Sequence, residues 1–211
     1  MIELDTDGDV RILRMRDGEN RFNRTFVDAF HEALDEVAAV EGPVALVAVG
    51  EGKFFSNGLD LDWLTTNGAD DTGFIDDVHR MLHRVLALDM ITVAAINGHA
   101  FAGGAMLATA FDYRIMREDR GYWCLPEVDL GLPLTTEMYE GLAAHLPRPA
   151  LADAALTGRR YSGPESLAVG IVTDVAPEGE VLERAVALAA SLAGKNRTVI
   201  AAHKRLLYGV G

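Results

Sequence analysis

Cysteine is almost absent from this chain, since Cys124 is the only one among 211 residues. A single cysteine cannot form a disulfide within the chain, and it excludes zinc sites built from several cysteines. The N-terminal residues 1–5 are acidic and lack the basic start and apolar core of a signal peptide. These absences predict a cytoplasmic protein in a reducing setting.

Basic residues are also scarce. Lys and Arg number 19 against 32 Asp and Glu, so the formal net charge is −13. Nucleic acids and anionic membranes are bound chiefly through clusters of Lys and Arg, so this balance argues against both as partners. An anionic small molecule would need a local basic patch that acts against the overall field of the protein.

One long stretch lacks charged residues altogether. Residues 90–111 contain no Asp, Glu, Lys or Arg and are numerous enough to cross a bilayer. The polar turn Asn97-Gly98-His99 and the pair Gly103-Gly104 interrupt the stretch near its middle, however. This arrangement favours a buried strand, a turn and a buried helix over a membrane span.

Hydropathy patterns predict strands and helices in alternation. Short β-branched or alternating runs indicate strands, and apolar residues three or four positions apart indicate helices. The expected strands are 2–4, 10–15, 44–49, 92–97, 112–116 and 171–175, the first two forming a hairpin. The expected helices are 25–40, 74–88, 103–111, 135–145, 149–156, 164–169, 180–193 and 197–208, with Thr25 and Asp28 as a capping pair. This order predicts one α/β domain with a parallel or mixed sheet covered by helices.

Two glycine-containing segments follow predicted strands, at 53–61 and at 96–106. A tight turn there lets the backbone approach a ligand, and a helix start leaves N–H groups without partners inside the helix. We expect the N–H of Gly103 and that of Leu59 to form a pair that binds a developing oxyanion. Each turn alone also fits a purely structural role, in which glycine only allows close packing of helix and sheet.

A phosphate-binding loop is a weaker interpretation of the second segment. Gly98 and Gly103 have the spacing of such a loop, but Gly104-Ala105 stand where Lys and Ser or Thr would contact phosphate and magnesium. No Gly-x-Gly-x-x-Gly motif follows a strand either. The sequence therefore predicts no nucleotide cofactor.

Glu127 is the strongest candidate for acid–base chemistry. It stands between Pro126 and Val128 in an apolar neighbourhood, where loss of solvation would raise the pKa of its carboxyl group. A glutamate after proline is also common in the first turn of a helix. Both interpretations stay open from the residues alone.

The three segments together resemble the crotonase (enoyl-CoA hydratase/isomerase) superfamily. Phe-Ser-Asn-Gly-Leu-Asp-Leu at 55–61 and Asn-Gly-His-Ala-x-x-Gly-Gly at 97–104 resemble its two oxyanion loops. Pro-Glu-Val-x-Leu-Gly-Leu at 126–132 resembles the segment with its catalytic glutamate. The resemblance extends from about Val10 to Tyr208, and its order and spacing also fit.

This resemblance implies a fold and an assembly. We expect a ClpP-like spiral of ββα units, with residues 1–145 as the core that holds the active site. Residues 146–211 would form a shortened C-terminal helical region that supplies a lid and trimer contacts without being an independent domain. A homotrimer or a dimer of trimers is the expected assembly.

The resemblance also implies an activity on acyl-CoA thioesters, with coenzyme A only as part of the substrate and no other cofactor. Glu127 would be the base, and Leu59 and Gly103 would supply the oxyanion N–H groups. Residues 111–116, followed by Asp-Arg-Gly at 119–121, most resemble Δ3,Δ2-enoyl-CoA isomerases. Hydratases of the superfamily carry a second glutamate where this chain has Met106, so a one-base isomerisation is expected.

Further contacts with the substrate follow from the same motifs. The expected substrate- or CoA-binding residues are Arg24, Lys53, Ser56, Gly58, Asp60, Trp63, Gly104 and Met106. Arg21, Lys204 and Arg205 are further candidates for phosphate contacts, and Trp63, Phe74, Met81 and Leu82 for an acyl-tail pocket, with surface or core roles as the alternatives. His79 and His83 lie four positions apart, but without the context of a metal motif they are expected to be solvated or to line a pocket. For His99 a place in the core is the favoured interpretation.

Two other functions stay open. Hydration or thioester hydrolysis could occur on the same scaffold. A non-catalytic acyl-CoA-binding protein, in which Glu127 only packs or caps a helix, is the alternative outside enzymology.

Overall fold

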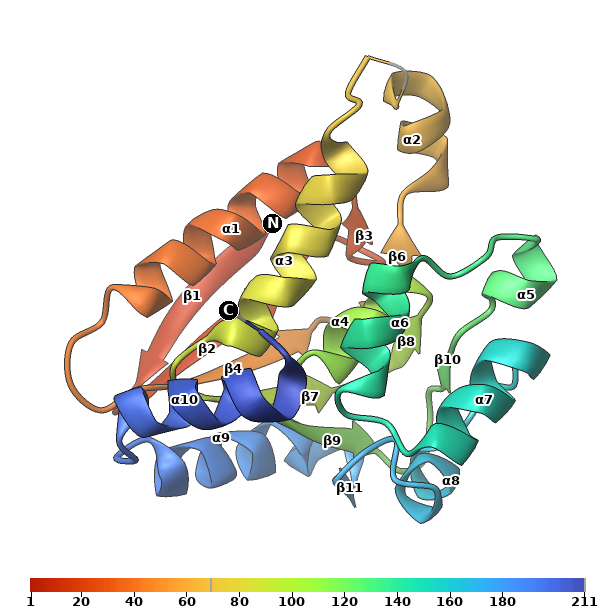
Figure 1. Ribbon diagram of the computed structural model, residues 1–211. Helices are drawn as coiled ribbons and strands as arrows, with labels where there is room; N and C mark the ends of the chain where they lie inside the picture. Colours follow the sequence, from red (N-terminus) through yellow and green to blue (C-terminus); the bar gives the residue numbers. More distant parts are fainter. Residues whose placement is uncertain (69, 211) are drawn as a thin grey trace.

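A six-stranded sheet runs through the computed structural model, which describes residues 1–68 and 70–210 (Figure 1). The order of its strands is β1-β2-β4-β7-β9-β11, with β1 and β2 antiparallel and the other neighbours parallel. These strands are β1 (Ile2–Asp7), β2 (Val10–Met15), β4 (Ala45–Gly50), β7 (Ile91–Ile96), β9 (Tyr113–Arg117) and β11 (Asp174–Ala176). The predicted hairpin is therefore confirmed, and of the two kinds of sheet expected, parallel or mixed, the observed sheet is mixed.

Side chains alternate between the two faces of this sheet, and each face packs on its own helices. On one face, strand residues such as Leu46, Ala48 and Ala94 share a core with α1 (Arg24–Ala38), α3 (Phe74–Ala87) and α4 (Gly103–Thr109). On the other face, residues such as Val47 and Ala95 pack against α9 (Val181–Leu192). Helix α9 lies below the sheet in Figure 1, opposite α1 and α3. Strands buried on both sides explain the continuous apolar runs in the sequence.

Each long strand of the spiral is followed by a short one, and then by helix. Strand β4 leads to β5, β7 to β8 and β9 to β10, and these three short strands form a separate sheet of order β10-β8-β5, while β3 and β6 form a sheet of two strands. The short strands are β3 (Arg21–Phe22), β5 (Phe54–Ser56), β6 (Gly58–Leu59), β8 (His99–Phe101) and β10 (Trp123–Cys124). This arrangement confirms the expected crotonase fold of ββα units.

The remaining helices are α2 (Leu61–Asn67), α5 (Glu127–Leu130), α6 (Thr136–Ala143), α7 (Arg148–Thr157), α8 (Gly163–Ala168) and α10 (Arg197–Tyr208), with a short 3-10 turn at Glu178–Glu180. Of these helices, α5 to α8 lie beyond one end of the sheet, on the right of Figure 1, while α2 stands apart at the top and α10 lies in front at the lower left. None of the helices in residues 1–68 and 70–210 is long and apolar enough to span a membrane. The uncharged stretch at 90–111 instead forms β7, β8 and α4.

The N-terminal cap of α1 differs from the prediction. Thr25 and Asp28 were expected to cap the helix, but Asn23 is the capping residue and its side chain accepts a hydrogen bond from the N–H of Phe26. Asp28 instead pairs with Arg24 one turn earlier. The helix begins one residue before the predicted start because asparagine is a better cap than threonine.

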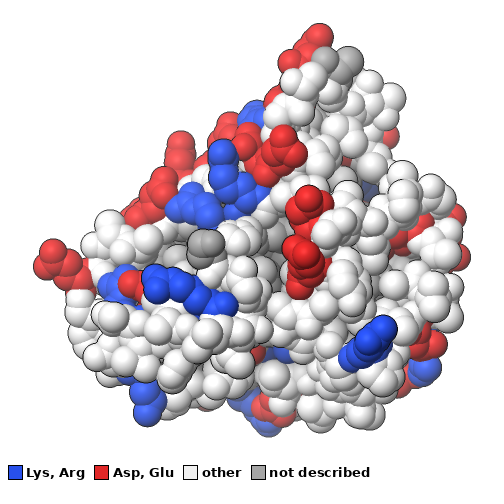
Figure 2. Space-filling model, viewed as in Figure 1, with Lys and Arg blue, Asp and Glu red and all other residues white. Residues whose placement is uncertain are grey.

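On the face of the molecule seen in Figure 2, the basic side chains over α1 and α3 have acidic neighbours. Blue and red groups lie next to one another over α1 and α3. Here Arg24 pairs with Asp71 and Asp77, and Arg84 pairs with Asp35 across the two helices. These arginines are therefore neutralised by ion pairs within the protein.

A buried ionic network fastens α10 to the core. Lys204 forms an ion pair with Asp112 at 2.7 Å and donates a hydrogen bond to the carbonyl of Met90 at 2.8 Å. Asp112 also accepts hydrogen bonds from the hydroxyls of Thr92 and Tyr208. The side chains of Lys204 and Asp112 are only 5% and 8% exposed, so the two charges depend on each other.

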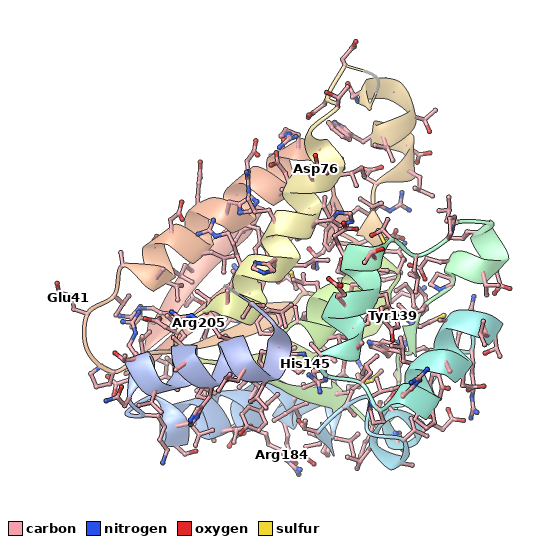
Figure 3. All side chains as sticks on the ribbon, viewed as in Figure 1. Glu41, Asp76, Tyr139, His145, Arg184 and Arg205 are labelled. Carbon is pink, nitrogen blue, oxygen red and sulfur yellow. The ribbon has the colours of Figure 1, made fainter. Side chains whose placement is uncertain are left out.

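His145 adds an aromatic contact to this attachment. It lies between α6 and α10 in Figure 3, and its ring packs on that of Tyr208 with centroids 4.2 Å apart. Burial lowers the pKa of His145 to about 3, with nearby Arg114 and Lys204 acting in the same direction. The ring is therefore neutral at physiological pH and packs as an aromatic group.

Substituting Asp112→Ala should lower the free energy of unfolding by about 3–5 kcal/mol, because the ammonium group of Lys204 would stay buried without a partner. Urea unfolding at neutral pH measures this change. The matched control is Glu180→Ala, which removes the exposed partner of Arg184 on α9 and should cost less than about 1 kcal/mol. Equal losses in the two variants would contradict a structural role for the buried network.

Candidate active site

The two glycine turns predicted to bind a ligand touch each other. Strand β6 pairs in parallel with β3, which places Gly58 beside Arg21 and Leu59 beside Phe22. Gly58 has a φ of +76°, and a Cβ atom there would lie 2.7 Å from the amide nitrogen of Gly103. Only glycine allows both this backbone conformation and this close approach. The first turn is therefore seated directly against the start of α4.

Hydrogen bonds fix the direction of the Leu59 amide. The N–H of Asp60 donates to the carbonyl of Phe22 at 3.0 Å, and the N–H of Gly58 donates to Oγ of Ser56 at 3.1 Å. Successive amides along an extended strand point in opposite directions, so the N–H of Leu59 faces away from β3. Leu59 also lines a cavity on that side.

The amide of Gly103 stands at the first position of α4. The first hydrogen bond that closes a turn of this helix runs from the N–H of Met106 to the carbonyl of Ala102, at 3.0 Å. The N–H groups before Met106 therefore have no helical partners. Ala102 has a φ of +50°, a strained conformation for alanine that turns the chain sharply from β8 into α4.

A cavity of about 490 Å³ lies against both turns. It brings together the expected oxyanion residues Leu59 and Gly103, the expected base Glu127, and Met106. The other lining residues are Arg21, Asn57, Leu61, Asp62, Val78, His79, Leu82, Phe101, Ala102, Pro126, Leu130, Leu132, Pro133 and Met138. Its volume and mostly apolar lining are typical of small-molecule sites.

Glu127 is the first residue of α5, directly after Pro126, and lines this cavity. It is 9% exposed, and its Oε2 atom is buried without a hydrogen-bond partner. Loss of solvation raises the pKa of the carboxyl group, although its own backbone N–H opposes the shift. The pKa direction expected from the sequence is confirmed. A carboxyl group in this setting can exchange protons with a bound molecule.

The cavity has no second buried carboxyl group among the described residues that line it. Asp62 is the other carboxylate in the lining, but its side chain is 96% exposed and lies 3.6 Å from Arg21. Met106 occupies the α4 position three residues after Gly103 and is 6% exposed. Any proton chemistry inside the cavity by a carboxyl group therefore falls to Glu127.

Several predicted contact residues build the turns instead of lining the cavity. Ser56 is fully buried, and its hydroxyl donates to the carbonyl of Asn20 at 2.7 Å while accepting from the N–H of Gly58. Gly104 packs directly on the backbone of Ser56, which leaves no room for a side chain. Asp60 caps α2 by accepting from the N–H of Trp63 at 3.1 Å.

Most of the apolar residues that were expected to form an acyl-tail pocket belong to the core. Trp63 packs on Phe74 with ring centroids 4.6 Å apart, and neither ring lines the cavity. Met81 is fully buried in the same core. Leu82 alone of this group lines the cavity. The amphipathic spacing of α3 could not distinguish a residue buried in the core, such as Met81, from one that lines the cavity, such as Leu82.

The basic candidates have different surroundings. Arg24 is held by the carboxylates of Asp71 and Asp77 and lies outside the cavity lining, and these contacts raise its pKa. Lys53 is exposed and lies over the ring of Phe54 at 5.3 Å. Lys204 is committed to its buried ion pair. Arg21 is the one described arginine or lysine among the residues that line this cavity.

Some lining residues were missed by the sequence interpretation. Asn57, Phe101 and Ala102 belong to the recognised glycine turns, so their positions in the motifs could have identified them. Pro133 and Met138 come from α6 and the segment before it, where the sequence has no such motif. His79 lines the cavity wall, which fits one of its two expected roles, and His83 is exposed on α3.

Comparisons with known proteins identify the family of this chain. A family model described as enoyl-CoA hydratase/isomerase matches residues 8–208. Enoyl-CoA delta isomerase 3 of Arabidopsis thaliana is 36% identical, over 99% of this chain and 92% of that protein. A putative enoyl-CoA hydratase of Thermus thermophilus is also 36% identical, over 95% of this chain and 81% of that protein.

Solved structures give the same result. An apo structure of an enoyl-CoA isomerase from Mycobacterium tuberculosis matches with a TM-score of 0.91 and 28% identity, over 99% of this chain and 91% of that one. Fold and site together define an acyl-CoA enzyme of the crotonase class. The chain belongs to the enoyl-CoA hydratase/isomerase family, and its homology to enoyl-CoA delta isomerases covers nearly its full length.

Substituting Glu127→Gln should raise the free energy of unfolding at pH 8. Burial raises the pKa of Glu127 in the folded state. The contribution of the Glu127 side chain to stability is therefore complete below the ordinary glutamate pKa of about 4.3, and it is lost as the pH rises through the raised pKa. The advantage of the glutamine variant should therefore shrink as the pH falls toward 4.

Denaturant unfolding between pH 4 and 8 measures this difference. Glu183→Gln, at an exposed position on α9, is the matched control and should show no comparable change. A glutamine variant at position 127 that is no more stable than wild type at pH 8 would contradict the desolvated state of the carboxyl group.

Proposed function

We propose that this enzyme isomerises 3-enoyl-CoA to 2-enoyl-CoA by a one-base 1,3-proton shift. The observation that carries the proposal is the buried carboxyl group of Glu127, whose Oε2 atom has no hydrogen-bond partner, in a cavity that Leu59 and Gly103 also line. Homologues described as enoyl-CoA delta isomerases support the same reaction.

The reaction begins when the Glu127 carboxylate removes a proton from C2 of the substrate. The electron pair from that C–H bond delocalises over C2, C4 and the thioester oxygen, so that the substrate becomes a dienolate with negative charge on this oxygen. The N–H groups of Leu59 and Gly103 donate hydrogen bonds to this oxygen and lower the barrier. Fixed amides suit this role because they need no reorganisation as the charge develops.

The second step returns the same proton. The carboxylic acid form of Glu127 protonates C4, the double bond moves from C3–C4 to C2–C3, and the carboxylate is regenerated. No atom is gained or lost, so the reaction needs no water and no second acid. A raised pKa suits Glu127 to both steps because proton removal and proton return then have similar driving forces.

Met106 favours isomerisation over hydration. Addition of water needs one group that activates water and another that handles the proton at C2. The apolar side chain of Met106 occupies the position where the family's hydratases have their second carboxylate. Hydration and thioester hydrolysis are therefore the less favoured alternatives within the same scaffold.

The outer part of the cavity suits the CoA portion of the substrate. Arg21 lies there beside Asn57 and Leu61, and its partners Glu19 and Asp62 hold its guanidinium in place. We assign the phosphate contacts to Arg21 in preference to Arg24, because Arg21 lines the cavity and Arg24 does not. Lys53 stays a candidate for a contact at the edge of the site.

The assembly and setting are part of the same proposal. We propose a trimer or a dimer of trimers, with residues 146–211 contributing lid and subunit contacts. Exposed apolar side chains on α10, such as Leu206 and Leu207, support an interface in this region. The single cysteine, which is buried, supports a reducing cytoplasmic setting.

The direct test offers purified enzyme 3-hexenoyl-CoA and 2-hexenoyl-CoA in separate assays. Wild-type enzyme should move the double bond of the first substrate into conjugation with the thioester, which is monitored by absorbance. The rate of this reaction should fall by at least about 10²-fold in Glu127→Gln. The rate should also fall as the pH drops through the raised pKa of Glu127. Hydration of the second substrate would contradict the conclusion that Met106 disfavours hydratase activity. Tight binding without turnover would favour a non-catalytic acyl-CoA-binding protein.

Substituting Gly58→Ala should lower kcat by about 10²–10³-fold, because the added methyl group displaces the amide of Gly103 from the oxyanion position. Steady-state kinetics with 3-hexenoyl-CoA measures the loss. Gly8→Ala is the control, since Gly8 also has a positive φ but lies in the β1–β2 turn with open space around it. Equal kinetics in Gly58→Ala and wild type would exclude the paired amides.

A further inference from the structure

A second cavity of about 420 Å³ adjoins the active-site cavity. The two share four lining residues, which are His79, Leu82, Met106 and Met138. Met106 is thus a wall of both, one turn into α4 from the oxyanion amide. The second space therefore lies next to the active-site cavity, on the other side of the Met106 side chain.

The second cavity is a groove between α3 and α6, with the end of α10 as its far wall. Its floor is apolar and consists of Leu82, Leu86, Met106, Ala110, Leu142 and Val210. Its rim carries polar side chains from the two helices, which are His79, Arg80, His83, Glu137 and Glu140. An apolar floor below a solvated rim suits a flexible hydrocarbon chain rather than a polar group.

The far wall is held in place by contacts already described. Tyr208 and Val210 close the groove at the C-terminal end of α10. Tyr208 is fixed by its hydrogen bond to Asp112 and by its packing on His145. The groove is therefore a preformed part of the fold, which lowers the entropic cost of ordering a ligand in it.

We propose that this groove binds the distal part of the acyl chain, so that the enzyme selects medium- and long-chain enoyl-CoA over short-chain substrates. The proposal rests on the proposed isomerase function for the position of the reacting carbons. A methylene group is similar in size to a water molecule, about 30 Å³, so the groove has room for on the order of ten methylenes.

Chain length should therefore have a large effect on binding. Each methylene moved from water onto an apolar surface strengthens binding by roughly three- to fourfold when fully buried. The groove is open on one side, so the effect of each methylene is smaller than this limit. We expect dodecanoyl-CoA to bind roughly 100-fold more tightly than hexanoyl-CoA.

Gly141 offers a substitution that fills the groove. It lies on α6 in the groove lining, and a Cβ atom there meets only Cδ1 of Leu86, at 3.9 Å. Gly141→Leu would place a branched side chain in the space between α6 and α3. Leucine is also a better helix former than glycine, so the change favours folding of α6. Ala143→Leu adds the same side chain at an exposed position on α6 outside the groove lining and is the matched control.

The experiment measures kcat/KM for 3-dodecenoyl-CoA and 3-hexenoyl-CoA, and Kd for the saturated twelve- and six-carbon thioesters by calorimetry. In wild type the longer chain should be favoured in both measurements. Gly141→Leu should reduce the twelve- to six-carbon ratio at least tenfold, while Ala143→Leu should leave it unchanged. Circular dichroism confirms that each variant is folded.

The two proposals fail in distinguishable ways. Equal Kd values for the two saturated thioesters in wild type, or an unchanged ratio in Gly141→Leu, would overturn the acyl-chain groove even if isomerisation is observed. Length-dependent binding that Gly141→Leu removes, together with an absence of turnover, would support the groove and overturn the isomerase function.

Discussion

The site depends on one close contact, the seating of Gly58 against the amide of Gly103. This contact joins two turns that are separated by more than forty residues in the sequence but follow neighbouring strands of the same spiral. The parallel pairing of β4 and β7 brings the turns to one edge, and buried Ser56 then locks the first turn. Glu127, from a third turn of the spiral, is the buried carboxyl group among the described residues that line the cavity beside this frame.

The burial of the Glu127 carboxyl group determines what this site can do chemically. An unpaired carboxyl oxygen in water would be an ordinary solvated group, but beside Pro126 in an apolar cavity it has lost its solvation without gaining a partner. A bound thioester would supply what is absent, a proton to remove and a place to return it. The same apolar surroundings strengthen the hydrogen bonds that the two amides can donate.

Much of this arrangement could be predicted from the sequence. Glycine, proline and glutamate were informative because a positive φ, a close backbone approach and a helix start impose strict local requirements, as at Gly58, Gly103 and Glu127. The long strands were also predictable, since strands buried on both faces leave unbroken apolar runs such as Val47 to Val49. The roles of Arg24 and Trp63 were less accessible, because their partners lie far away along the chain. Nothing local distinguishes an arginine bound by Asp71 and Asp77 from one that is free to bind phosphate.

The central claim is that both amides meet one thioester oxygen while Glu127 faces the adjacent carbons. A crystal structure of the enzyme with bound hexanoyl-CoA, an unreactive saturated thioester, tests it most directly. The account predicts the carbonyl oxygen at about 2.7–3.1 Å from the amide nitrogens of both Leu59 and Gly103, with the Glu127 carboxyl group directed at C2. A thioester oxygen bound to neither amide, or a carboxyl group turned away from the acyl chain, would contradict it.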